Sequence, residues 1–254
     1  MSNQSPVLWH IWISHYSEKA RWALDYKRVP HRRRALPGGF HMAAAAALTR
    51  GRSATFPVLV LDGEAIGDST AIIGALERDR PEPSLYPEDP AERRRALDLE
   101  EYFDEELGPA IRLLAWHELT GDPQRLAQLT KRFLPADLRE TQPALDLSAA
   151  FASVFTGLRY DARSEEAAER SRRRVVAALD RLETELDGDE YLVGGRFSVA
   201  DLTAAALFYP LALPPEGPDI GDPPEGFERF RHPLAERPGF RWVVETYRRH
   251  RRWR

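Results

Sequence analysis

The chain has 254 residues, 43% hydrophobic and 30% charged, which excludes a disordered protein and fits one large or two ordinary domains. Its 36 basic and 40 acidic residues give a net charge of −4, so the overall charge gives no reason to expect nucleic acid. There is no cysteine, which excludes disulfides, thiolate metal sites and a cysteine nucleophile.

Strand and helix signals alternate at the start of the chain. Val7 to Ile13 is rich in β-branched and aromatic residues and is interpreted as a buried strand. A helix is expected over Ser14 to Lys27, with Ser17 as its N-cap. A weaker strand, Val29 to Leu36, and an alanine-rich helix at about Met42 to Leu48 follow.

The clearest strand is Thr55 to Leu61. Asp62-Gly63 predicts a hairpin turn into a short strand, Glu64 to Gly67. Asp68-Ser69-Thr70 then caps another helix, so the predicted order is β-α-β-α-β-β-α. We expect residues 1–80 to form one α/β domain.

A linker is predicted at residues 81–90, because Arg80 to Pro90 contains four prolines and has no helical period. Residues 91–254 are expected to form an all-α helical-bundle domain. Its predicted helices are Ala91 to Leu119, Glu166 to Leu186, Ser198 to Leu211 and Phe240 to Arg252. Ser198 with Asp201 predicts a capping box that starts a buried helix.

Other charged groups are interpreted as solvated surface. This applies to the acidic run Glu100, Glu101, Asp104, Glu105 and Glu106 and to the basic tail Arg248 to Arg254. The seven histidines show no paired metal spacing, so no metal site is expected. The longest apolar stretch, Leu202 to Leu213, is too short to cross a bilayer, and Met1 to Pro6 has no signal-peptide pattern. We therefore expect a cytoplasmic protein without membrane or nucleic-acid partners.

Three features are candidates for a site, each with a structural alternative. Pro57 inside a strand indicates an edge position or a cis bond after Phe56. Asp68-Ser69 is a helix cap, but a helix N-terminus with these side chains also suits an α-amino acid group. Ser14 follows the first strand, where a hydroxyl points into a cleft at the sheet's carboxyl edge.

In this order and spacing, the strand–Ser14–helix opening, TFPVLVLDGEAIGDSTAI and GRFSVADLTAAAL closely resemble the glutathione transferase family over nearly the whole chain. The resemblance implies an N-terminal thioredoxin-like domain, a helical C-terminal domain and a homodimer. It also implies that glutathione is the substrate or cosubstrate, since the chain has no thiol of its own.

The resemblance assigns roles residue by residue. Phe56 before a cis-Pro57 would pair its backbone with the cysteinyl part of glutathione, and Asp68 and Ser69 would hold its γ-glutamyl group. Ser14 matches the thiol-activating serine of the theta- and zeta-like classes, with Ser17 and Tyr16 as alternates. His15 and Tyr16 stand in the middle of the motif SHYS, where His15 would crowd or titrate near the thiol.

The function that follows from the resemblance is conjugation of the glutathione thiolate to a hydrophobic electrophile. Between the domains, we expect the second substrate to contact Tyr16, Tyr102, Ile111 and Trp116. Two alternatives stay open: a non-catalytic binding or scaffold protein on the same fold, and a glutathione-dependent isomerase or dehalogenase.

Overall fold

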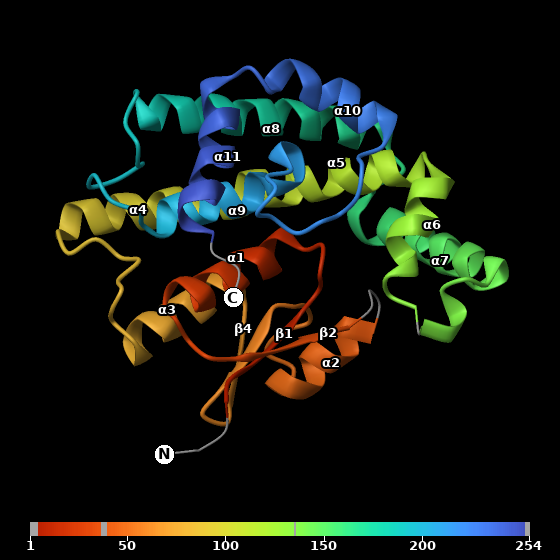
Figure 1. The fold of residues 1–254 in the computed structure, drawn as a ribbon, viewed down its shortest axis with the longest axis horizontal. Coiled ribbons are helices and arrows are strands. Elements are labelled where there is room, and N and C mark those ends of the chain that lie inside the picture. The colour runs from red at the N-terminus through yellow and green to blue at the C-terminus, as the bar shows by residue number, and fades with distance from the viewer. Residues whose placement is uncertain (1–4, 37–39, 135, 252–254) are drawn as a thin grey trace.

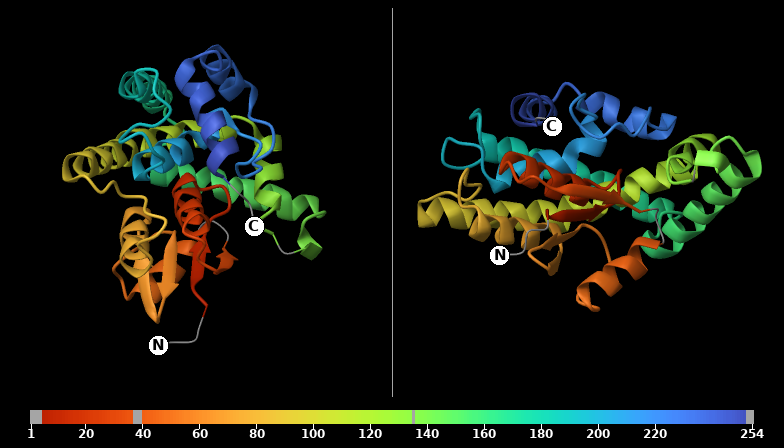
Figure 2. Two further views of the ribbon diagram at one scale, coloured as in Figure 1. Left: turned by 60° about the vertical axis from the view of Figure 1, so that its left-hand side comes forward. Right: turned by 60° about the horizontal axis from the view of Figure 1, so that its bottom comes forward.

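The computed structural model describes residues 5–36, 40–134 and 136–251. A small α/β part made by the first third of the chain lies against a larger helical part (Figure 1). Two further views show the same two-part arrangement from the side and from below (Figure 2). This confirms the predicted fold class.

The sheet has four short strands in the order β2-β1-β3-β4. β1 pairs in parallel with β2 and antiparallel with β3, and β3 pairs antiparallel with β4. The strands are β1 (Val7–His10), β2 (Arg32–Ala35), β3 (Val58–Leu61) and β4 (Glu64–Gly67). β3 begins three residues later than predicted, after Pro57, which has no N–H to donate to the ladder.

Three helices accompany this sheet: α1 (His15–Tyr26), α2 (Phe40–Thr49) and α3 (Ser69–Asp79). The predicted cap of α1 was wrong. Ser14 is the N-cap, and its Oγ accepts a hydrogen bond from the Ser17 backbone N–H at 3.2 Å. Ser17 is instead fully buried, and its Oγ accepts from the Ile11 N–H at 3.2 Å, which ties the helix to the end of β1.

The helical part begins with one long rod in three pieces. The predicted helix over Ala91 to Leu119 is α4 (Pro90–Tyr102), a π-helical turn (Phe103–Leu107) and α5 (Gly108–Thr120). The remaining helices are α6 (Pro123–Lys131), α7 (Gln142–Tyr160), α8 (Glu165–Leu186), α9 (Val199–Ala212), α10 (Glu225–Arg231) and α11 (Pro238–His250). Short 3₁₀ turns lie at Ala136–Leu138 and His232–Leu234.

The two parts meet mainly along α1, which packs on α3 and on the fully buried helix α9. The expected capping box at the start of α9 is present: Asp201 accepts from the backbone N–H of Ser198 at 2.8 Å. Burial raises the pKa of Asp201 to about 6, against the hydrogen bonds that favour its ionised form. α6 and α7 extend past the sheet on the side of α2 (Figures 1 and 2).

Two surface interpretations were wrong. Glu100 and Asp104 are not part of a solvated face, because both form ion pairs with the buried Lys19 of α1. Arg251 is also buried, and it pairs with Glu18 and Asp25 of α1. Neither contact has a local sequence signal, since each joins segments far apart in the chain. Arg252, at the predicted end of the last helix, lies outside the described residues.

No helix in the described ranges is both long and apolar enough to cross a membrane. In those same ranges, no group of three or more His, Asp or Glu side chains is arranged to hold a metal ion.

Candidate active site

One large cavity of about 1430 Å³ opens between the α/β part and helices α5 to α7. Five predicted site residues line it together: Ser14, Phe56, Pro57, Asp68 and Ser69. They come from three separate segments, namely the start of α1, the approach to β3 and the start of α3. Ser17 is not among the lining residues, because it faces β1.

Ser14 stands at the N-terminus of a 12-residue helix. The bond from the Ser17 N–H engages a lone pair of the hydroxyl, so capping does not use the hydroxyl proton. The proton can therefore be donated to an anion in the cavity. The same helix terminus adds a positive dipole end, which favours negative charge beside Ser14.

The Phe56–Pro57 peptide bond is cis, as the resemblance implied. Phe56 is buried and lies before the first paired residue of β3, so its backbone stands outside the sheet ladder. This is the geometry in which an extended peptide can add its own backbone hydrogen bonds.

Asp68 and Ser69 form the cap and the first residue of α3. Asp68 Oδ1 accepts from the backbone N–H groups of Thr70 and Ala71, at 2.9 and 3.0 Å. Its φ of 75° lies where side-chain-bearing residues are rare and cost about 1–3 kcal/mol, and such strain concentrates at functional sites. The buried Ser69 is the first residue of α3, so its hydroxyl lies at the positive end of the helix dipole.

A cluster of the buried Lys19 and Glu100 with the half-buried Thr70 and Asp104 lies next to the Asp68–Ser69 pair. Lys19 Nζ is 2.8 Å from Glu100 and 2.5 Å from Asp104, and it donates to Thr70 Oγ1 at 2.9 Å. Burial alone would lower the pKa of Lys19, but the two carboxylates outweigh it and raise the pKa. The cluster joins α1, α3 and α4, so it fixes the start of α3 against the helical part.

Tyr16 lines the cavity, but its hydroxyl donates a hydrogen bond within the protein. The hydroxyl donates to the backbone carbonyl of Asp104 at 2.8 Å, and burial raises its pKa above the ordinary value. Gly108 gives the ring its room: a Cβ there would lie 2.1 Å from the Tyr16 oxygen. The backbone of Gly108 is ordinary helix, so the requirement for glycine is one of space.

Of the expected walls for a second substrate, Ile111 and Trp116 line the cavity, but Tyr102 does not. Consecutive helical residues are turned by about 100°, so Tyr102 faces away from the side on which Glu101 and Asp104 lie. Its ring instead packs under the guanidinium of Arg181, 5.6 Å from the ring centre.

Comparison with known protein families identifies the family to which this chain belongs. A model of the glutathione S-transferase N-terminal domain matches residues 8–84, and a model of the glutathione S-transferase C-terminal domain matches residues 165–253. The chain belongs to the glutathione S-transferase family. The N-terminal match includes all the residues of the α/β part that line the cavity.

Relatives of this glutathione S-transferase match over part of the chain. A probable maleylacetoacetate isomerase of Caenorhabditis elegans is 36% identical over 96 residues, which are 38% of this chain and 45% of that protein. A maleylacetoacetate isomerase of Dictyostelium discoideum is 30% identical over 113 residues, 43% of this chain and 51% of that protein. The chain thus spans about half the length of these relatives.

Solved structures share the fold across the whole chain. The β-etherase LigF of a Sphingobium strain has a TM-score of 0.62 at 21% identity, covering 96% of this chain and 100% of that one. A glutathione S-transferase of Methylobacterium radiotolerans, in complex with glutathione sulfonate, has a TM-score of 0.56 at 22% identity and covers 94% of each chain.

For two cavity residues of this glutathione S-transferase, the structure indicates a role that the sequence did not predict. His15 was expected to crowd or titrate near the thiol. Burial, and then the charge of Arg112, lower its pKa to about 3, so the ring does not titrate near neutral pH. Arg112, on α5, had no assigned role. Its only sequence signal is a single cation in the otherwise apolar stretch Ile111 to Trp116.

Proposed function

We propose that this chain is a glutathione-dependent enzyme in which Ser14 stabilises the glutathione thiolate for attack on an electrophilic carbon. The observation that carries the proposal is the convergence of Ser14, cis-Pro57 and the Asp68–Ser69 pair on one cavity. Membership of the glutathione S-transferase family supports it.

Glutathione would be held along its length by these groups. The N-terminus of α3 and Ser69 suit the γ-glutamyl carboxylate. Both capping bonds of Asp68 engage Oδ1, so Oδ2 is left for the ammonium group. The Phe56 backbone would pair with the cysteinyl residue, which brings the sulfur towards Ser14.

Ser14 and the N-terminus of α1 can supply the free energy that is needed to ionise the glutathione thiol. A free thiol has a pKa of about 8.5, and lowering it by about 2 units needs about 2.7 kcal/mol of preference for the thiolate. A charge-assisted hydrogen bond from Ser14 supplies about 1.5–3 kcal/mol and the α1 dipole about 0.3–1 kcal/mol. The thiol proton leaves to solvent, the sulfur pair forms the C–S bond, and the leaving group departs with its bonding pair.

Calorimetry with glutathione tests the proposal. We expect the wild-type protein to bind glutathione, and Ser69→Ala to weaken binding by roughly ten- to a hundredfold, as for loss of a hydrogen bond to a charged group. Ser171→Ala is the matched control, because Ser171 is a buried serine of α8 that does not line the cavity. Absence of glutathione binding to the wild type would contradict the proposal.

Glutathione-dependent isomerisation is the second candidate, and the relatives named maleylacetoacetate isomerase favour it. In that reaction glutathione adds to the substrate and is released again, so it is not consumed. Following glutathione concentration during turnover separates the two reactions. A homodimer, a role in detoxification and a cytoplasmic location stay predictions.

A further inference from the structure

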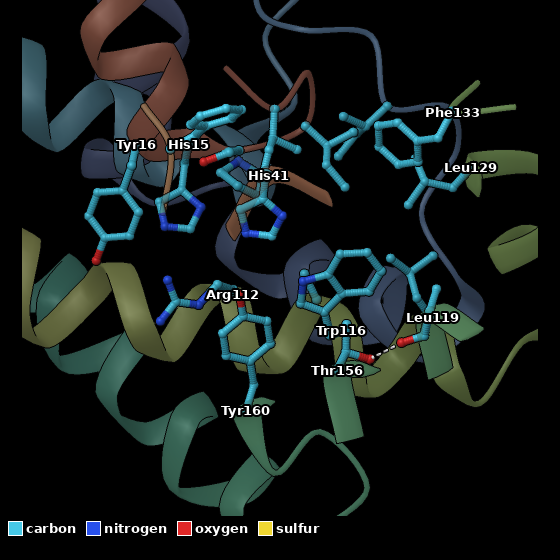
Figure 3. Close-up of a pocket in the computed structure, with 18 of the residues that line it drawn as sticks. His15, Tyr16, His41, Arg112, Trp116, Leu119, Leu129, Phe133, Thr156 and Tyr160 are labelled. Carbon is cyan, nitrogen blue, oxygen red and sulfur yellow. Dashed lines mark hydrogen bonds between the residues drawn. The ribbon is translucent and has the colours of Figure 1, made fainter. Parts of the chain in front are cut away.

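The cavity contains a cation that no carboxylate neutralises in the described part of the chain. Arg112 projects from α5 between Tyr16 and His15 on one side and Tyr160 on the other (Figure 3). Its guanidinium carbon lies 4.5 Å from the ring centre of Tyr160 and 5.7 Å from that of Tyr16. Its Nε is buried and has no hydrogen-bond partner among the residues that the structure describes.

Arg112 is half-buried, and the fully buried cations of the described chain behave differently. Lys19, Arg21, Lys27 and Arg251 each lie within 2.8 Å of a carboxylate oxygen, as expected for a charge removed from water. Arg112 has aromatic rings in place of that carboxylate. Such rings attract a cation but leave its N–H donors unsatisfied. Arg112 is therefore a candidate to bind an anion from outside the chain.

A second polar atom close to Arg112 is also unsatisfied. His15 is 4% exposed, and its Nε2 has no hydrogen-bond partner within the described residues. Because the ring is neutral, it does not compete with Arg112 for an anion. Figure 3 shows both side chains facing the same space, beside the start of α1.

Arg112 is not one of the residues that the proposed function assigns to glutathione. The proposed function places the γ-glutamyl group on α3 and the sulfur at Ser14, both on the α/β side of the cavity. Arg112 comes from α5 of the helical part, and the aromatic residues Trp116, Phe155 and Tyr160 line the same cavity. A volume of about 1430 Å³ exceeds the usual range for one drug-sized ligand, so a second molecule has room.

We propose that Arg112 binds a carboxylate on the second substrate, and that this substrate is an aromatic electrophile that carries a negative charge. The inference rests on the proposed function and deepens it. The aromatic side chains receive the ring, Arg112 receives the carboxylate, and the electrophilic carbon faces the sulfur held at Ser14.

A pair of electrophiles with and without a carboxylate tests this. With glutathione present, kcat/KM is measured for chlorodinitrobenzene and for its analogue chlorodinitrobenzoate, in wild type and in Arg112→Gln. We expect the substitution to lower kcat/KM for the benzoate about tenfold or more, through KM, and to leave the neutral compound nearly unchanged. Arg112→Lys keeps the charge and should recover part of the loss.

Arg159→Gln is the control, because Arg159 also packs on Tyr160, at 5.5 Å, but is exposed and does not line the cavity. It should leave both substrates unaffected. An equal fall for both substrates in Arg112→Gln would place Arg112 in thiol activation or folding and overturn the inference, as would no change for either.

If wild type turns over neither compound, conjugation of these aromatic halides fails, but the inference is still decided by binding without glutathione. Calorimetry then compares naphthoate with naphthylmethanol. A preference for naphthoate that disappears in Arg112→Gln supports the anion site. Equal binding of the two probes to wild type overturns it.

Discussion

Charge is treated in two opposite ways along α1. In the turns that pack against α3, α4 and the C-terminal segment, called the paired side here, Glu18, Lys19 and Arg21 are buried and each is paired. At the N-terminal end of the helix, called the cavity side here, His15 and the facing Arg112 of α5 carry polar atoms without partners in the described chain. The paired charges hold parts of the molecule together, whereas the unpaired Arg112 is where we propose that a ligand binds.

The largest expected effect comes from breaking the paired side. Lys19→Met leaves Glu100 and Asp104 near each other without their cation, so the free energy of unfolding should fall by about 3–5 kcal/mol. Denaturant unfolding measures it. Lys131→Met is the control, because that lysine pairs with Glu140 in solvent, where such pairs contribute about 0–1 kcal/mol. Equal losses in the two variants would remove the contrast.

The next effect concerns the thiolate on the cavity side. Ser14→Ala removes the donor and should raise the pKa of bound glutathione, with a loss of about 1.5–3 kcal/mol, or roughly ten- to a hundredfold in rate at neutral pH. Ultraviolet absorbance of the thiolate against pH measures the pKa directly. Because Ser14 also caps α1, the variant loses about 1 kcal/mol of stability as well.

Ser14→Asp separates the two roles of that side chain. Aspartate caps a helix as well as serine does, but its charge opposes a thiolate beside it. We expect stability to be kept and the thiol pKa to rise at least as far as in Ser14→Ala. A thiol pKa unchanged in both variants would show that Ser14 is only a cap.

A smaller effect concerns the neutral His15, which should make the free energy of unfolding depend on pH. The pKa of His15 is about 3 in the folded protein against 6.5 ordinarily, so between these values the unfolded chain binds more protons. The contribution of the neutral ring is complete above pH 6.5 and is lost as the pH falls towards 3. At pH 5 the loss is about 2 kcal/mol.

His15→Asn should therefore reduce the fall in unfolding free energy between pH 7 and pH 5, measured by denaturant titration at both values. His10, whose pKa is also lowered to about 3 by burial and by Arg21, supplies part of the slope that remains. The same pH dependence in wild type and variant would mean that His15 is not held neutral by the fold.

Local patterns predicted much of this molecule. The alternation of strand and helix and the Asp68–Ser69 cap are properties of neighbouring residues. The family resemblance implied the site residues that line the cavity, and the cis bond at Pro57 that it also implied is present.

What could not be predicted depends on tertiary partners. Ser14 and Ser17 are both plausible caps, and the choice is made by the Ile11 N–H, which needs an acceptor once it is part-buried. Glu100 and Asp104 look solvated until Lys19 is placed against them. Arg112 can be read as a ligand site only when the absence of a carboxylate around it, in the described chain, is known.

The absence of a side chain at Gly108 also sets how closely the α/β part approaches the helical part. Tyr16 from the α/β part rests on this residue of the helical rod, and even a methyl group would collide with its oxygen. A substitution there would act as a wedge between the two parts. We therefore expect a larger residue at this position to change the width of the cavity, and with it the range of molecules that can enter, although Gly108 is not among the lining residues.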